Sequence, residues 1–148
     1  MVRDRGFDMN ILDTLRISAS GMGAQRVRLQ AISSNIANAR STSTQEGEPY
    51  RRRMPVFKSV VHDPFGTQLD RNLSRVEVVD IEKSQADFRQ VFDPSHPDAD
   101  EEGYVRYPNV DILYEMVDMM TTSRSYEANT SAAETTYQMA NLALELVR

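Results

Sequence analysis

The sequence of 148 residues contains no cysteine. This absence excludes disulfides, thiolate metal sites and cysteine nucleophiles, and it is compatible with either redox compartment. Long apolar runs are also missing, since no stretch approaches the roughly 18 consecutive apolar residues that a membrane-spanning helix needs. The N-terminus is charged but is followed by neither an apolar run nor a small-residue cleavage site. We therefore predict no membrane insertion and no cleaved secretory signal.

Positive charge is scarce, and the net charge of -5 argues against a general nucleic-acid binder. Lysine is rare, because 15 of the 17 basic residues are arginine. Arginine suits forked contacts with carboxylates at subunit surfaces. Apolar residues make up 40% and charged residues 26% of the chain, which is an ordinary globular mixture. A chain of this length is expected to form one domain with a modest core.

Two segments have the periodicity of amphipathic helices. In residues 11–39, apolar residues recur every seven positions, which predicts a helix of about four heptads. Gly21 and Gly23 lie inside it, and each costs roughly 1 kcal/mol relative to alanine. In residues 109–148, apolar and small residues alternate at three- and four-residue steps, as in a coiled-coil seam. The predicted assembly seam comprises Leu15, Met22, Leu29, Ile32, Ile36, Ile112, Met116, Met119, Tyr126, Ala133, Tyr137 and Leu144.

Between these helices the sequence changes character. Residues 50–61 and 75–81 are rich in valine and alternate with polar residues, so we predict strands there. Residues 63–66 predict a turn, and residues 93–103 an acidic loop broken by prolines. The fold class predicted is α+β, with long N- and C-terminal helices that form an antiparallel coiled coil and a small β-containing middle segment. The expected organisation is a flexible extension (1–10), a terminal helical assembly domain (11–39 and 109–148) and a loop and β-containing middle region (40–108).

The acidic loop is the best candidate for a metal site. Asp98, Asp100, Glu102 and Gly103 fit the first half of a calcium-binding loop. The twelfth position is Asn109, where a bidentate glutamate is needed, and two prolines stand where the entering helix belongs. The alternative is a solvated acidic turn, so we predict no metal site.

Signals for catalysis are weak. Gly21 and Gly23 resemble the start of a phosphate-binding fingerprint, but the third glycine is missing and the motif lies within a helix. The only histidines, His62 and His96, fall in predicted turns, and no nucleophile-elbow pattern is present. We predict that the protein is not an enzyme and uses no cofactor.

Three consecutive arginines, Arg51 to Arg53, follow Tyr50. Alternate side chains of a strand face opposite sides, so the three do not form one basic face for nucleic acid. We expect them instead to bond loop carboxylates or a neighbouring subunit.

Asn35 and Asn38 stand three residues apart near the end of the first predicted helix. Asparagine is common at helix C-termini, and this is one interpretation. The other is that the two carboxamides bond a neighbouring backbone and fix how adjacent subunits stack. The spacing alone leaves both open.

The string Ser-Ser-Asn-Ile-Ala-Asn-Ala at residues 33–39, preceded by Ser-Ala-Ser-Gly-Met at 18–22, resembles the N-terminal signature of the flagellar rod and hook protein family. A polar insertion before residues 49–52, the acidic loop and residues 116–129 resemble its proximal rod members in particular. The residues that carry this resemblance are Ser34, Asn35, Ala37, Asn38, Pro49, Tyr50, Asp93, Pro94, His96, Pro97, Gly103, Pro108 and Asn109.

The resemblance implies an axial structural subunit of the basal-body rod in the periplasmic space. It implies that other rod proteins and copies of the chain are its partners, that it polymerises into a helical tube, and that the flagellar type III export apparatus secretes it without a cleaved signal. Residues 1–8 depart from the family pattern, which leaves the start at Met1 or Met9 open. Because two weak helices gain stability only when their seams are buried, we expect folding to be coupled to assembly. The alternative function is that of a soluble coiled-coil adaptor or export chaperone.

Overall fold

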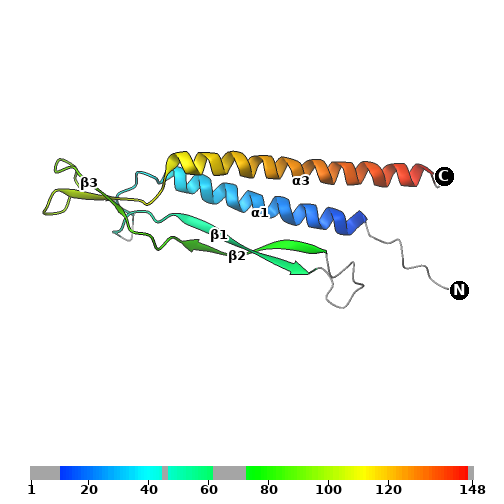
Figure 1. Ribbon diagram of the computed structural model, residues 1–148, viewed down its shortest axis with the longest axis horizontal. Coiled ribbons are helices and arrows are strands. Elements are labelled where there is room, and N and C mark those ends of the chain that lie inside the picture. Colours follow the sequence, from blue (N-terminus) through cyan, green and yellow to red (C-terminus); the bar gives the residue numbers. More distant parts are fainter. Residues whose placement is uncertain (1–10, 45–46, 62–72, 147–148) are drawn as a thin grey trace. The chain divides into compact units, whose positions relative to one another are not determined.

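The computed structural model describes residues 11–44, 47–61 and 73–146. Long helices form both ends of this part of the chain, and the sequence that connects them forms two small β-sheets (Figure 1). This confirms the predicted α+β class with long terminal helices. The elements in order are α1 (Ile11–Ala37), β1 (Arg53–Val61), β2 (Ser74–Lys83), β3 (Arg89–Phe92), β4 (Tyr104–Tyr107) and α3 (Ile112–Leu146). The predictions for residues 1–10, for the turn at 63–66 with His62, and for residues 147–148 lie outside the described residues.

Side chains cap both helices close to the predicted boundaries. α1 ends at Ala37, where the Asn38 amide group donates to the Ser34 carbonyl over 2.9 Å. α3 begins three residues later than predicted. The Asp111 carboxylate accepts from the backbone N–H of Leu113 at 2.9 Å and so satisfies a donor that the first helical turn leaves without a partner. The sequence before this cap therefore remains outside the helix.

The two sheets are both two-stranded. β1 pairs with β2, close to the two segments predicted as strands. β3 and β4 are antiparallel, with Phe92 opposite Tyr104, and they were not predicted because four residues give too little alternation to recognise. They place the acidic loop at the end of a hairpin. Gly103 has φ +82°, and a Cβ there would lie 3.0 Å from the Phe92 ring, so this turn requires glycine.

The described residues divide into two compact units. The junction unit contains residues 27–56 and 80–122, and the terminal unit contains residues 11–26, 57–61, 73–79 and 123–146. α1 and α3 each contribute to both units. Inside the junction unit the two helices run antiparallel, because Arg28 contacts Asp118 whereas Asn35 contacts Glu115. Inside the terminal unit, Gly21 of α1 lies against Asn129 of α3.

The buried residues of α3 are polar. Glu115, Thr122 and Thr136 are buried, whereas Met116 and Tyr137, one position later, are exposed. One residue is about 100° around a helix, so Met116 and Tyr137 point away from the buried side, whereas the seam residues Met119 and Ala133 are half-buried. The threonines tolerate burial because their hydroxyls bond the carbonyls four residues earlier, over 2.7 Å for Thr122 and 2.8 Å for Thr136.

Within residues 11–44, 47–61 and 73–146, neither helix has an apolar stretch of the length and hydropathy needed to cross a membrane.

Candidate functional site: a buried polar junction and an open basic groove

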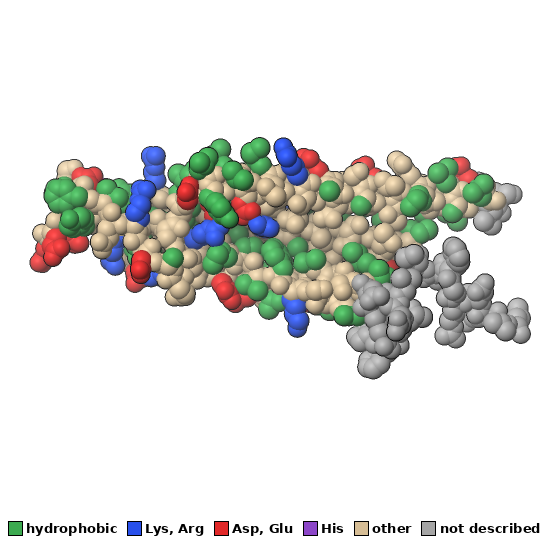
Figure 2. All heavy atoms as spheres, viewed as in Figure 1, with side chains coloured by type: hydrophobic (Ala, Val, Ile, Leu, Met, Phe, Trp, Pro, Cys, Tyr) green, Lys and Arg blue, Asp and Glu red, His purple; other side chains and the backbone are tan. Residues whose placement is uncertain are grey.

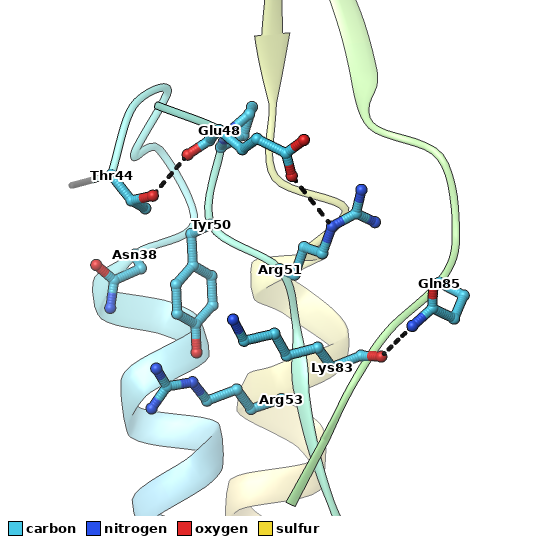
Figure 3. Close-up of a pocket in the computed structure, with 9 residues that line it drawn as sticks. Asn38, Thr44, Glu48, Tyr50, Arg51, Arg53, Lys83 and Gln85 are labelled. Carbon is cyan, nitrogen blue, oxygen red and sulfur yellow. Dashed lines mark hydrogen bonds and ion pairs between the residues drawn. The ribbon is translucent and has the colours of Figure 1, made fainter. Parts of the chain in front are cut away.

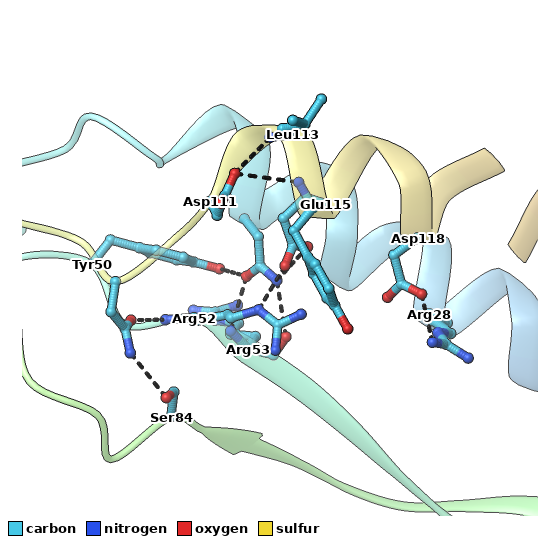
Figure 4. A network of polar contacts seen from close by, with 12 residues as sticks. Arg28, Tyr50, Arg52, Arg53, Ser84, Asp111, Leu113, Glu115 and Asp118 are labelled. Carbon is cyan, nitrogen blue, oxygen red and sulfur yellow. Dashed lines mark hydrogen bonds and ion pairs between the residues drawn. The ribbon is translucent and has the colours of Figure 1, made fainter. Parts of the chain in front are cut away.

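Asn35 is the centre of a buried polar junction inside the junction unit. Figure 4 shows its partners Tyr50, Arg53 and Glu115. Its amide nitrogen donates to the Arg53 carbonyl and to the Glu115 carboxylate, each over 3.0 Å. Its amide oxygen accepts from the Arg53 N–H and from the Tyr50 hydroxyl, each over 2.9 Å. Both donors and both lone pairs are therefore used. The two bonds to Arg53 imitate the pairing of a β-strand, which explains why the position needs a carboxamide and not a carboxylate.

Glu115 and Arg52 add charge to this junction. Glu115 is 1% exposed, and its carboxylate accepts from the Arg52 Nε over 2.6 Å as well as from Asn35. The Arg52 guanidinium also lies 5.9 Å from the centre of the Tyr114 ring. A buried carboxylate needs such compensation, because transfer of an isolated charge out of water is strongly unfavourable. The junction thus ties α1, the entry to β1 and the first turn of α3 together.

Asn109 extends the junction to the end of β2. Its side-chain oxygen accepts from the Arg52 N–H over 3.3 Å, and its nitrogen donates to the Ser84 hydroxyl over 2.9 Å. The Ser84 N–H in turn donates to the Arg52 carbonyl over 2.8 Å. Asn109 therefore links the entry to β1 with the residue that follows β2.

Burial raises the pKa of the Tyr50 hydroxyl, which donates to Asn35. The positive charge of Arg53 opposes this increase in pKa, and the negative charge of Glu115 adds to it. The phenol is therefore held in its neutral, donating form. This is the form that the Asn35 oxygen requires.

The two asparagines of the α1 signature have different roles. Asn38 caps its own helix through Ser34 and accepts from the Ser41 hydroxyl over 3.3 Å, as the helix-end interpretation predicts. Asn35 bonds a backbone, but this backbone belongs to Arg53 of the same chain. Its four hydrogen-bonding positions are occupied within the chain, so Asn35 fixes the internal arrangement of the junction unit.

The acidic loop binds its own backbone. The Asp100 carboxylate accepts from the N–H groups of Glu102 and Tyr104, over 3.1 and 2.8 Å, and the Asp98 carboxylate accepts from the Thr42 hydroxyl over 2.7 Å. His96 accepts from the Asp98 N–H over 3.1 Å. These contacts match the solvated-turn alternative. Within the described ranges, no group of three or more histidine, aspartate or glutamate side chains is placed to hold a metal ion.

The other signature residues of the hairpin also shape it. The Asp93 carboxylate accepts from the hydroxyl of Ser95 over 2.6 Å and from its N–H over 3.2 Å, which lowers the pKa of Asp93. Pro94 contacts the position where a Gly103 side chain would lie. Pro108 is buried after β4, whereas Pro97 is exposed.

The three consecutive arginines have three different environments. Arg51 stacks on the Phe88 ring at 4.3 Å, and its Nε lies 3.7 Å from the Glu48 carboxylate, which is a loop carboxylate as expected. Arg52 bonds a helix carboxylate, Glu115. The Arg53 side chain is exposed and lies 5.7 Å from the centre of the Tyr50 ring. They do not form one basic face, in agreement with the prediction.

An open groove of about 580 Å³ lies beside these arginines (Figure 3). Its walls carry three cationic side chains, Arg51, Arg53 and Lys83, and one carboxylate, Glu48. Buried Pro49 and Tyr50 line it as well. The sequence alone does not predict this groove, because Lys83 is 30 positions from Arg53. The pairing of β1 with β2 brings the two residues together.

The predicted seam residues are only partly covered within the chain. Ile32 is buried at 2% exposure. Half-buried positions are Leu15, Met22, Leu29, Ile36, Met119 and Ala133, and exposed positions are Ile112, Met116, Tyr126, Tyr137 and Leu144. Their role in contacts between subunits stays a prediction.

Glu115 is a residue of the junction that the sequence did not indicate, and it is the helix carboxylate that Arg52 bonds in place of the expected loop carboxylate. A glutamate on a helix is ordinarily solvated. The available signal was its position in the first turn, three residues after Ile112 and one before Met116, inside an otherwise apolar or small stripe. Ser34, by contrast, belongs to the signature but acts through its backbone carbonyl, which accepts from the Asn38 N–H and from the Asn38 side chain.

Comparisons with known proteins identify the family of this chain. The family model described as flagellar basal body rod FlgEFG protein C-terminal matches residues 101–146, and the model described as flagella basal body rod protein matches residues 15–43. The chain is 42% identical to the flagellar basal-body rod protein FlgC of Bacillus subtilis, over 93% of this chain and 99% of that protein. It is 36% identical to FlgC of Borreliella burgdorferi, over 95% of this chain and 99% of the relative, and 41% identical to FlgC of Aquifex aeolicus, over 88% and 92%. Identity at this level over nearly full length means that the chain belongs to the family of the flagellar basal-body rod protein FlgC.

Proposed function

We propose that this chain is a structural subunit of the flagellar basal-body rod and that it polymerises through its two terminal helices. The names of its relatives support the rod assignment, and they do not favour the alternative of a coiled-coil adaptor or export chaperone. Its partners would be other rod proteins and copies of itself. The assembled tube would transmit torque and conduct exported subunits.

The observation that carries the proposal is the exposed apolar surface of α3. Leu113, Val117, Leu142, Leu144 and Leu146 are between 56% and 88% exposed. Figure 2 shows such side chains near both ends of this helix. Monomeric soluble proteins rarely carry large apolar patches unless the patch binds something. Because the inward side of α3 is polar, its apolar residues are available to other chains.

The remaining features belong to the same proposal. The terminal helical assembly domain would be 11–39 with 109–148, and residues 40–108 would form the outer part of the tube. Export through the flagellar type III apparatus into the periplasmic space, without a cleaved signal, would deliver the subunit. Catalysis is not part of this role, since the family's named function is structural.

Electron microscopy of basal bodies from a strain that lacks the gene tests the rod assignment. We expect rods to be missing or truncated, and expression of the chain should restore them. Normal rods together with a discrete soluble oligomer would instead support the adaptor alternative.

Circular dichroism tests whether folding is coupled to assembly. The dilute full-length chain should be less helical than the assembled form. A shortened chain without both helices should lack this difference. High helicity in the dilute full-length monomer would contradict the coupling.

A further inference from the structure

The basic groove is shaped to receive carboxylates. Arg53 and Lys83 project into the same space beside the Tyr50 ring (Figure 3), and both side chains are exposed. Arg51 is held on one wall by Phe88 and Glu48, so its charge is fixed in place. The net charge of the lining is therefore positive.

The tip of the β3–β4 hairpin has the complementary charge. Asp100 and Gly103 fix the shape of this tip, through the backbone bonds and the positive φ described above. This arrangement leaves the Glu101 and Glu102 side chains exposed, and Figure 2 shows acidic side chains at the end of the hairpin. Among the described residues neither carboxylate forms an ion pair, either with the groove of its own chain or elsewhere.

We propose that the Glu101–Glu102 tip of one copy docks into the Arg53 and Lys83 groove of a neighbouring copy. The inference rests on the proposed function, because a polymerising subunit presents tip and groove in equal number. The two patches differ, so the contact is heterologous and can propagate along a helical array. A second copy is the occupant that the charges favour, since a hairpin delivers two adjacent carboxylates on a preformed turn.

This contact sets the position of the neighbour more than it adds affinity. Exposed ion pairs contribute little individually, whereas like charges brought together across an interface are strongly unfavourable. The carboxylates of a correctly placed tip meet cations, and a shifted neighbour loses that match. The exposed apolar side of α3 would supply the non-directional attraction, and the tip and groove would select the register.

Charge reversal tests the proposal with two matched variants of the full chain. Variant A carries Glu101→Lys and Glu102→Lys in the tip, and variant B carries Arg53→Glu and Lys83→Glu in the groove. Each alone brings like charges together, so we expect self-association in sedimentation at low salt to weaken about 100-fold. Cells that contain only A or only B in place of the original gene should lose rods and motility.

A mixture of A and B should recover both properties. The lysine tip of A fits the glutamate groove of B, and the unchanged tip of B fits the unchanged groove of A. A partner other than a second copy would retain its own charges and would give no such recovery. A control with Arg75→Glu and Glu77→Lys, both exposed on β2, should associate and swim like the unchanged chain.

The outcomes separate this inference from the proposed function. If A and B alone assemble normally, or if they fail and their mixture fails too, the docking proposal is overturned and the rod assignment stands. If the deletion strain builds normal rods, the rod assignment itself fails. Glu101→Gln with Glu102→Gln removes the charges without repulsion and should give a smaller loss, which guards against misfolding of the lysine variant.

Discussion

The junction unit and the terminal unit hold themselves together by different means. Buried apolar residues in the junction unit include Ile32, Tyr50 and Val105, and the same unit contains the buried bond between Asn35 and Glu115. In the described part of the terminal unit, the buried apolar residue is Ala24 alone. The C-terminal part of α3 in that unit exposes a succession of large apolar side chains: Tyr137, Met139, Leu142, Leu144 and Leu146.

This difference assigns separate tasks to the two units. Hydrogen bonds and ion pairs are directional, so the junction unit can set the register of its helix segments without help from another chain. Apolar burial is non-directional, so the terminal unit can adapt to whichever neighbours it meets. We therefore expect coupling of folding to assembly to concern the terminal unit above all.

Replacement of Glu115 should have the largest effect. Glu115→Ala leaves the Arg52 guanidinium and the Asn35 amide without their acceptor, and removal of one partner of a buried pair costs about 3 kcal/mol. Urea unfolding of the isolated chain measures this loss. Glu134→Ala, at an exposed position of α3 in the terminal unit, is the matched control and should stay within about 0.5 kcal/mol. Equal losses of unfolding free energy for the two variants would contradict the difference between the junction unit and the terminal unit.

The two asparagines provide the next test. Asn35→Ala removes four hydrogen bonds and leaves buried groups of Arg53 and Tyr50 unsatisfied, so we expect a loss of about 2 kcal/mol in the free energy of unfolding. Asn38→Ala removes local bonds at the end of α1 and should cost less, about 1 kcal/mol. Thermal denaturation of both variants checks the order. The reverse order would place the more important amide at the helix cap.

The sequence predicted the helices well because their periodicity extends over many turns. It predicted the hairpin strands poorly, since Arg89–Phe92 and Tyr104–Tyr107 are four residues each. Along α3, Glu115, Thr122 and Thr136 are buried, whereas Met116 and Tyr137 are exposed. Periodicity identifies apolar residues, but it does not show which residues of the facing helix they meet. The buried residue of α1 that contacts Glu115 of α3 is the polar Asn35. Asn35 stands out by its spacing from Asn38, and the resemblance adds Tyr50 and Asn109, but the common location of the three depends on contacts between segments far apart in sequence.

Alkaline pH should weaken the junction unit. Because the folded pKa of Tyr50 is raised above its ordinary value, its contribution to stability is complete below about pH 10 and is lost as the pH rises through the folded pKa. Tyr50→Phe should cost about 1 kcal/mol at neutral pH, from the lost bond to Asn35, and should remove this part of the alkaline loss. Unfolding curves of both proteins between neutral and alkaline pH provide the measurement. An identical alkaline loss in the variant would contradict the assignment.

Two glycines of α1 test how closely the helices pack in the terminal unit. Gly23→Ala should stabilise the helix by about 1 kcal/mol, because among the described residues nothing beyond the adjacent helix backbone lies within 4 Å of the new Cβ. Gly21→Ala should lose this gain, because its Cβ would lie 3.0 Å from the Asn129 side-chain nitrogen. Thermal melts compare the two. Adding Asn129→Ala to Gly21→Ala should recover the gain if close approach is the cause, and no recovery would point away from this contact.

Polar replacements at the C-terminal part of α3 should have the smallest effect on the isolated chain. Leu142 and Leu144 are 60% and 70% exposed, so Leu142→Gln with Leu144→Gln should change the free energy of unfolding of the monomer by less than about 0.5 kcal/mol. The same variant should fail to restore rods in the deletion strain, because assembly is the step that buries these side chains. Glu145→Gln is the neighbouring exposed control and should restore them. A stable monomer that cannot assemble would place the function of these leucines outside the single chain, whereas a destabilised monomer would mean that the terminal unit already depends on them before it meets a neighbour.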